Sequence, residues 1–86
     1  TFRAMPKFFR SAEHKAVQDI LREMRLAAGL NQSDLAAMLG QSQSYVSKYE
    51  NGDRVLDFLE VRHLCKVLGK SLSAFAEEIE VRINES

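Results

Sequence analysis

The stretch NQSDLAAMLGQSQSYVSKYENG, residues 31–52, constrains the fold more than any other part of this sequence. It holds two apolar-periodic runs that are joined at Gly40 by a turn of about three residues. Helices of roughly eight or nine residues are not stable alone, so both runs must pack against the rest of the chain. A connection this short also keeps two helices from lying antiparallel. The sequence therefore predicts a steep helical corner around Gly40.

The four glycines follow the ends of apolar-periodic segments and divide the chain into five predicted helices. A glycine tolerates a positive φ, which closes a helix at low cost. The sequence shows no strand-like alternation of useful length, no linker and no internal repeat. The predicted helices run over residues 12–28, 31–39, 42–51, 57–68 and 71–83.

Polar side chains that can accept a hydrogen bond from a free backbone N–H mark the predicted helix starts. The clearest start combines Asp57 and Glu60 in a D-x-x-E capping box, with Leu56 and Val61 placed as a hydrophobic staple. The other expected caps are Ser11, Asn31 with Asp34, Ser42 and Ser71.

Apolar residues at helical spacing give each predicted helix one buried stripe, which is enough for a single core. The expected stripes are Val17, Ile20, Leu21 and Met24; Leu35, Ala36 and Leu39; Val46 and Tyr49; Phe58, Val61, Leu64, Cys65 and Leu68; and Leu72, Phe75, Ala76, Ile79 and Ile83. We therefore predict an all-α fold, a compact bundle of five short helices over residues 12–86, preceded by an N-terminal arm, residues 1–11.

Several functional classes are excluded by composition. Hydrophobic residues make up 45% of the chain, too many for a disordered protein, and no apolar run reaches the roughly 20 residues that span a bilayer. The single cysteine, Cys65, excludes an internal disulfide and suits a reducing cytoplasm. Cys65, His14 and His63 have no metal-ligand spacing. No paired carboxylates, phosphate-binding glycine loop or activated nucleophile is visible, so we expect no enzyme, metal or cofactor.

The outward face of residues 42–51 needs more than a structural corner to explain it. With Val46 and Tyr49 inward, this face carries short or uncharged hydrogen-bonding side chains. Gln pairs with adenine and Lys with guanine in the DNA major groove. A merely solvated face would more often carry Glu and Lys at i,i+4 spacing. We therefore favour double-stranded DNA as the partner and a helix-turn-helix as the motif. The exposed residues are Gln43, Ser44, Ser47, Lys48 and Asn51.

Charge gives a mixed signal. The net charge is zero, whereas most nucleic-acid-binding domains are basic. Residues 1–30 carry six Lys and Arg against three acids, and residues 51–86 carry five against seven. A domain with one basic and one acidic end can still present a positive face to DNA.

The segment LNQSDLAAMLGQSQSYVSKYENGDR, residues 30–54, resembles the Cro and phage-repressor class of helix-turn-helix proteins, the Xre-like family with a lambda-repressor-like fold. The resemblance extends over residues 16–79. It includes the RLAAGLNQ entry, the YENG exit of the second motif helix, and the LGKSLSAF junction between the last two helices.

The resemblance implies a role for individual residues. Gln32 falls where the family binds a phosphate at a helix N-terminus, a position whose free amides suit an anion. Arg25 and Glu50 match a charge pair that ties the first helix to the third. The implied base-reading residues are Gln43, Ser44 and Lys48, with Ser47 a weaker candidate, and the implied backbone contacts are Ser42 and Asn51.

Two departures from the family pattern affect the expected DNA contacts. Asp53 stands where a lysine is common, and Arg54 beside it could compensate as a backbone contact. Tyr45 could touch a phosphate or sugar, or pack against a neighbouring helix. The arm carries three phenylalanines among three basic residues, so it could reach DNA or cover the core, and Met5 is a candidate natural start.

These features predict a bacterial or phage-encoded, cytoplasmic transcription regulator, a repressor that places residues 43–51 in the major groove of a near-palindromic operator. We expect a homodimer through the last helix, where Ile79 and Ile83 continue the apolar stripe. Two alternatives stay open. The protein could be the antitoxin of a toxin–antitoxin pair, or a protein-docking domain that uses the same fold without reading DNA.

Overall fold

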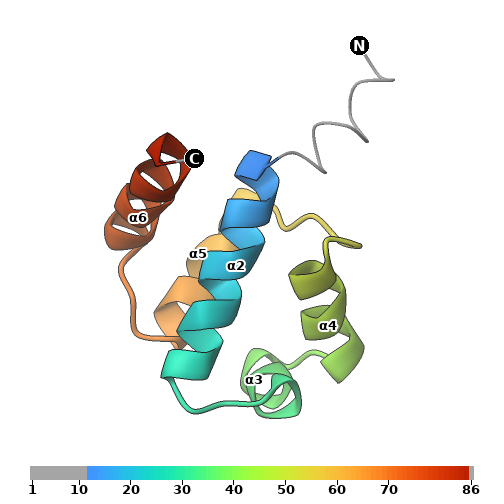
Figure 1. Ribbon diagram of the computed structural model, residues 1–86. Coiled ribbons are helices and arrows are strands. Elements are labelled where there is room, and N and C mark those ends of the chain that lie inside the picture. Colours follow the sequence, from blue (N-terminus) through green and yellow to red (C-terminus); the bar gives the residue numbers. More distant parts are fainter. Residues whose placement is uncertain (1–11, 86) are drawn as a thin grey trace.

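The computed structural model describes residues 12–85, and this part of the chain forms five α-helices and no strand (Figure 1). The prediction of an all-α bundle is confirmed. The helices are α2 (Ala12–Ala27), α3 (Gln32–Leu39), α4 (Gln43–Asn51), α5 (Phe58–Val67) and α6 (Leu72–Asn84).

The helices start where the capping residues predicted. Asn31 and Asp57 each form a reciprocal capping box with the residue three positions on. The side chains of Ser42 and Ser71 accept hydrogen bonds from the backbone N–H groups three residues later. The predicted cap Ser11 lies outside the described residues. These caps satisfy backbone donors that a helix start otherwise leaves unpaired, so four short helices acquire fixed beginnings.

The core lies where α2 passes between the other helices. In Figure 1, α4 and α6 flank α2 on opposite sides, while α5 lies behind it and α3 closes the lower end. Small Ala36 on α3 and Val46 on α4 are both buried where these two helices touch. The buried apolar residues are Ala16, Ile20, Leu21, Met24, Leu35, Ala36, Val46, Tyr49, Leu64, Cys65 and Phe75.

Two residues of the predicted stripes are exposed. Phe58 is 69% exposed, and Ala76 is exposed as well. Phe58 is the first residue of α5, and at this end of the helix α2 and α6 leave an open apolar groove of about 480 Å³. Phe58 and Ala76 line that groove together with Ile79. The helical spacing of Phe58 and Ala76 therefore predicted burial, and this prediction was wrong for both side chains.

The corner between α3 and α4 depends on Gly40, which adopts the left-handed conformation with φ of 69°. Its N–H and that of Gln41 donate to carbonyls of the last turn of α3, including Ala36 O at 2.9 Å from Gln41 N. This arrangement ends α3 and redirects the chain within a few residues. The conformation of Gly40 thus sets the direction in which α4 leaves α3.

A buried ion pair joins α2 to α4. Arg25 Nε donates to Glu50 Oε2 at 2.8 Å and Arg25 Nη2 to Glu50 Oε1 at 3.0 Å, while Nη1 donates to the carbonyl of Leu30 at 2.9 Å. Only 7% and 3% of the Arg25 and Glu50 side-chain surfaces are exposed. The hydrogen bonds with Glu50 raise the pKa of the guanidinium. This planar, bidentate geometry is the kind in which a buried charge pair can offset its desolvation.

Substitution of Gly40 tests the corner. Gly40→Ala should lower the free energy of unfolding by about 1–2 kcal/mol, because an L-residue resists the left-handed conformation even where its Cβ has open space. Gly40→Asn should lose less, since Asn tolerates that conformation. Urea unfolding followed by far-UV circular dichroism measures both. An unchanged unfolding midpoint for Gly40→Ala would show that the corner does not require glycine.

A double-mutant cycle tests the buried pair. Glu50→Ala should lower the free energy of unfolding by about 3–5 kcal/mol, because it leaves the Arg25 guanidinium buried without its carboxylate. Arg25→Ala with Glu50→Ala should lose less than the two single losses combined. The matched control is Glu23→Ala, which breaks an exposed pair with Arg82 and should lose only about 0.2–1 kcal/mol. Strictly additive losses at Arg25 and Glu50 would mean that the pair contributes nothing.

Candidate nucleic-acid interface

The exposed side of α4 is a continuous polar surface. Gln43, Ser44, Lys48 and Asn51 are exposed, and Ser47 is half-buried among them. Val46 and Tyr49 on the opposite side of the helix are buried in the core, so the polar residues cannot turn inward. A long hydrogen bond of 3.4 Å joins Asn51 Nδ2 to Ser47 Oγ. The helix begins at Ser42, whose hydroxyl caps Tyr45 N. The structure therefore gathers the five predicted polar residues on one face.

A chain of side-chain amides connects this face to the buried ion pair. Gln43 Nε2 donates to Gln32 Oε1 at 2.7 Å, and Gln32 Nε2 donates to Glu50 Oε1 at 3.0 Å. Gln32 is the first residue of α3. Its side chain contacts α4 at both ends, through Gln43 in the first turn and Glu50 in the last. The carboxylate of Glu50 orients the amide of Gln32, which in turn orients that of Gln43. Sequence reasoning assigned these residues separate roles and did not predict their contact.

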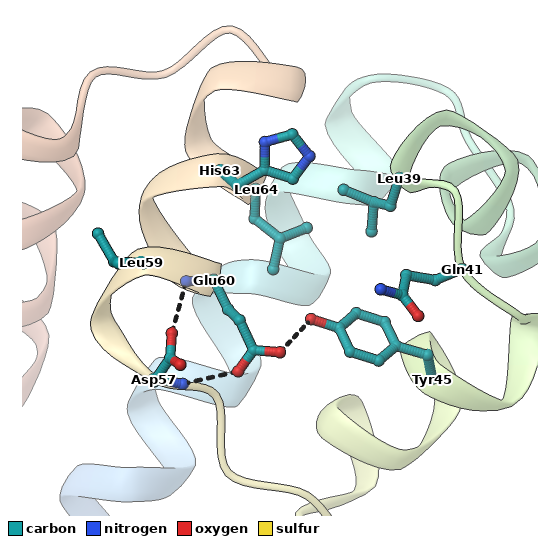
Figure 2. Close-up of a pocket in the computed structure, with 8 residues that line it drawn as sticks. All are labelled: Leu39, Gln41, Tyr45, Asp57, Leu59, Glu60, His63 and Leu64. Carbon is teal, nitrogen blue, oxygen red and sulfur yellow. Dashed lines mark hydrogen bonds between the residues drawn. The ribbon is translucent and has the colours of Figure 1, made fainter.

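Tyr45 and Arg54 meet at a carboxylate of α5. Tyr45 Oη donates to Glu60 Oε2 at 2.9 Å, as Figure 2 shows, and Arg54 Nη2 donates to the same oxygen at 2.7 Å. The Arg54 guanidinium lies 5.0 Å from the centre of the Tyr45 ring, a cation–π arrangement. The ring also packs edge-on against Tyr49. Of the two placements foreseen for Tyr45, the structure shows contact with a neighbouring helix.

The protonation states agree with this network. Burial and then the Glu60 carboxylate raise the pKa of Tyr45 to about 12, so its phenol remains a donor at neutral pH. The Asp57 backbone N–H and the Arg54 guanidinium hold the pKa of Glu60 below its ordinary value. Since its folded pKa is the lower one, Glu60 stabilises the fold at neutral pH, and that contribution is lost as the pH falls through the acidic range.

Glu60 is the residue at this site that sequence reasoning missed. Its spacing from Asp57 revealed the capping box, in which Asp57 N donates to Glu60 Oε1 at 2.9 Å. Nothing in the sequence indicates that its second oxygen accepts from Tyr45, fifteen residues away, and from Arg54. A contact of that kind depends on how α4 and α5 cross, and local spacing does not reveal the crossing.

Outside the polar face of α4, the described residues include a buried thiol and a shallow pocket. Within residues 12–85, no three His, Cys, Asp or Glu side chains are grouped to hold a metal ion. None of the described helices combines the length and apolarity that crossing a bilayer requires.

Cys65 is buried, and burial raises the pKa of its thiol. His63 is exposed and lines the shallow pocket of about 250 Å³ that Figure 2 shows.

Comparison with known proteins supports the helix-turn-helix geometry. The XRE-family like protein from Pseudomonas syringae pv. tomato str. DC3000 is 40% identical, with a TM-score of 0.78 over 91% of this chain and 95% of that chain. The restriction-modification controller protein C.Esp1396I is 27% identical, with a TM-score of 0.78 over 86% of this chain and 95% of that chain. ClgR, the clp gene regulator from C. glutamicum, shares the fold at 24% identity, with a TM-score of 0.73 over 84% of this chain and 92% of that chain.

No curated protein sequence is significantly similar to this one. A family model described as Helix-turn-helix (HTH_3) matches residues 21–75, more than half of the chain. The matched segment runs from the second half of α2 to the start of α6 and contains the whole α3–α4 corner. The chain therefore belongs to the Cro/C1-type, Xre-like helix-turn-helix family of DNA-binding regulators.

Proposed function

We propose that this DNA-binding transcription regulator is a repressor that inserts α4 into the major groove of a near-palindromic operator. The observation that carries the proposal is the polar face of α4, in which Gln43 is held by Gln32 and exposed Lys48 lies one turn beyond exposed Ser44. Such a face matches the hydrogen-bond donors and acceptors of base edges. A protein-docking surface would carry more aromatic and aliphatic side chains. The likeness to a restriction-modification controller supports a regulatory role.

The contacts divide into base-reading and backbone groups. Gln43, Ser44, Ser47 and Lys48 would meet base edges, because they lie on the polar face within the first six residues of α4. Flanking them, Gln32, Ser42 and Asn51 would contact the phosphate backbone and fix the position of the domain. Tyr45 and Arg54 were expected at the backbone too. Both bind Glu60 in the free protein, so a phosphate would have to displace a carboxylate to reach them.

Selection of bound sequences from a random duplex pool, followed by substitution, tests the reading face. Lys48→Ala and Gln43→Ala should each weaken operator binding by about 1–3 kcal/mol and relax the preference at one base pair. Asn51→Ala should weaken binding to all sequences alike. Gln32→Ala should do both, because it removes a backbone contact and the partner that orients Gln43.

The comparison of base preference decides the assignment. A preference unchanged by both Lys48→Ala and Gln43→Ala would remove α4 as the reading element. A chain that selects no sequence at all would favour the protein-docking alternative over DNA reading.

We propose a homodimer through α6 and the neighbouring apolar groove. One α4 carries too few contacts to find a single site in a genome, and the zero net charge gives a monomer little phosphate-neutralising surplus. Phe58, which is 69% exposed and lines the groove, is an apolar side chain that a second copy could cover. Ile79 lines the groove and Ile83 extends the same helix as half-buried residues. Phe58 thus enlarges the surface expected from α6 alone.

The spacing of half-sites tests the dimer. Two-fold symmetry should place the two copies of α4 about 34 Å apart, one helical turn of DNA. Affinity should therefore rise steeply when a second half-site lies one turn from the first, and should fall when the spacing changes by half a turn. Electrophoretic mobility shifts on a series of spacer lengths measure this. Binding that gains nothing from a second half-site at any spacing would contradict the dimer.

A further inference from the structure

The carboxylate of Glu60 connects the recognition helix, the loop that follows it and the start of α5. We propose that Glu60 is a positioning residue that sets the angle at which α4 is presented to DNA, acting through Tyr45 and Arg54. The inference rests on the proposed function, because presentation of α4 to base edges is the property that Glu60 would set.

Glu60 is itself held rigidly. The backbone N–H of Asp57 donates to Oε1 at 2.9 Å, and the backbone N–H of Glu60 donates to Asp57 Oδ1 at 2.8 Å. This reciprocal capping box fixes the carboxylate relative to the first turn of α5. The position of the remaining oxygen, Oε2, is therefore set by α5. This oxygen accepts hydrogen bonds from Tyr45 in α4 and from Arg54 in the loop that follows α4.

Those groups control α4 at two points. Tyr45 is the third residue of α4, and its ring lies between the helix and Glu60 (Figure 2). Arg54 lies three residues beyond Asn51, the last residue of the helix, and donates to the same carboxylate oxygen. Charge-assisted hydrogen bonds of 2.7 and 2.9 Å are short and directional, so they restrain rotation of α4 as well as its distance from α5.

The second restraint on α4 lies on another side of the helix. Glu50, bound by Arg25 and Gln32, is five residues from Tyr45, which places the two side chains about 140° apart around an α-helix. One carboxylate belonging to α4 and one belonging to α5 thus hold the helix from two directions. Two such restraints limit the rotation of α4 about its own axis, in addition to the apolar packing of Val46 and Tyr49. Base readout tolerates displacements of only about half an ångström and 10–20°.

A different role for the same contacts predicts the opposite result. If Tyr45 and Arg54 were phosphate contacts that Glu60 merely occupies in the free protein, removing its charge would release both donors. DNA affinity would then rise for every sequence. If Glu60 positions α4, removing its charge should lower affinity for the operator and leave sequence-independent binding as it was.

Glu60→Gln is the test variant, because Gln also serves in a capping box and has the same size. Its single amide oxygen cannot accept from Asp57, Tyr45 and Arg54 together. Affinities for the selected operator and for a random-sequence duplex are measured by fluorescence anisotropy, at a temperature where circular dichroism shows each variant folded. We expect operator affinity to fall about tenfold, the loss that one displaced base contact produces, with random-duplex affinity unchanged.

Tyr45→Phe removes the other end of the contact and should lower the ratio of operator to random-duplex affinity in the same way. The double variant Tyr45→Phe with Glu60→Gln should fall little further than either single variant, since both break one restraint. Phe keeps the packing of the ring against Tyr49, so lost packing does not account for the change.

Asp19→Asn is the matched control. Asp19 accepts two hydrogen bonds from Lys15, at 3.0 and 3.1 Å, so the variant loses the same charge and an exposed cation contact. Both residues belong to α2, and neither lines the apolar groove. The ratio of operator to random-duplex affinity should equal that of the unchanged protein.

The outcomes separate cleanly. An unchanged ratio in folded Glu60→Gln would make Glu60 a helix cap without influence on reading, and would overturn the inference. A rise in affinity for both duplexes beyond that of Asp19→Asn would overturn it in favour of competition with phosphate. If the unchanged protein selects no operator, the proposed function itself fails, a result visible before any Glu60 variant is made.

Discussion

The buried pair of Arg25 and Glu50 is the interaction on which the geometry of the motif depends. Arg25 lies in the last turn of α2 and Glu50 in the last turn of α4, and the guanidinium also binds the Leu30 carbonyl in the loop that leads to α3. One side chain thereby connects three segments: α2, the loop before α3, and α4. Removing one partner of such a buried pair is far more costly than the pair itself is favourable, because the other charge is left buried without a partner.

Helix α4 is held by polar contacts on both flanks and by apolar packing beneath. Glu50 and Gln32 restrain one flank, Glu60 restrains the other, and Val46 anchors the buried side. At nine residues α4 has little stability of its own, so its orientation comes from these neighbours. Apolar contacts fix how deeply the helix sits, whereas directional hydrogen bonds fix its rotation.

The sequence predicted what local chemistry determines. Asn31, Asp57 and the glycine at position 40 marked real helix ends, because caps and left-handed turns act within a few residues. Prediction failed where the outcome depends on how helices meet. Phe58 has the spacing of a core residue yet lines an open groove, and Glu60 was read only as a cap. The resemblance that suggested Arg25 with Glu50 supplied tertiary information that spacing alone does not contain.

The hydrogen bond from Gln43 to Gln32 means that the proposed reading surface depends on two helices. The amide of Gln43 is oriented by Gln32 at the start of α3, and the amide of Gln32 is in turn oriented by Glu50. Transplanting residues 43–51 onto another scaffold would therefore transfer the side chains of α4 without Gln32, the residue that orients Gln43. If α4 reads DNA as proposed, the unit that carries specificity is the whole corner: two helices, the turn at Gly40 and the carboxylate of Glu50.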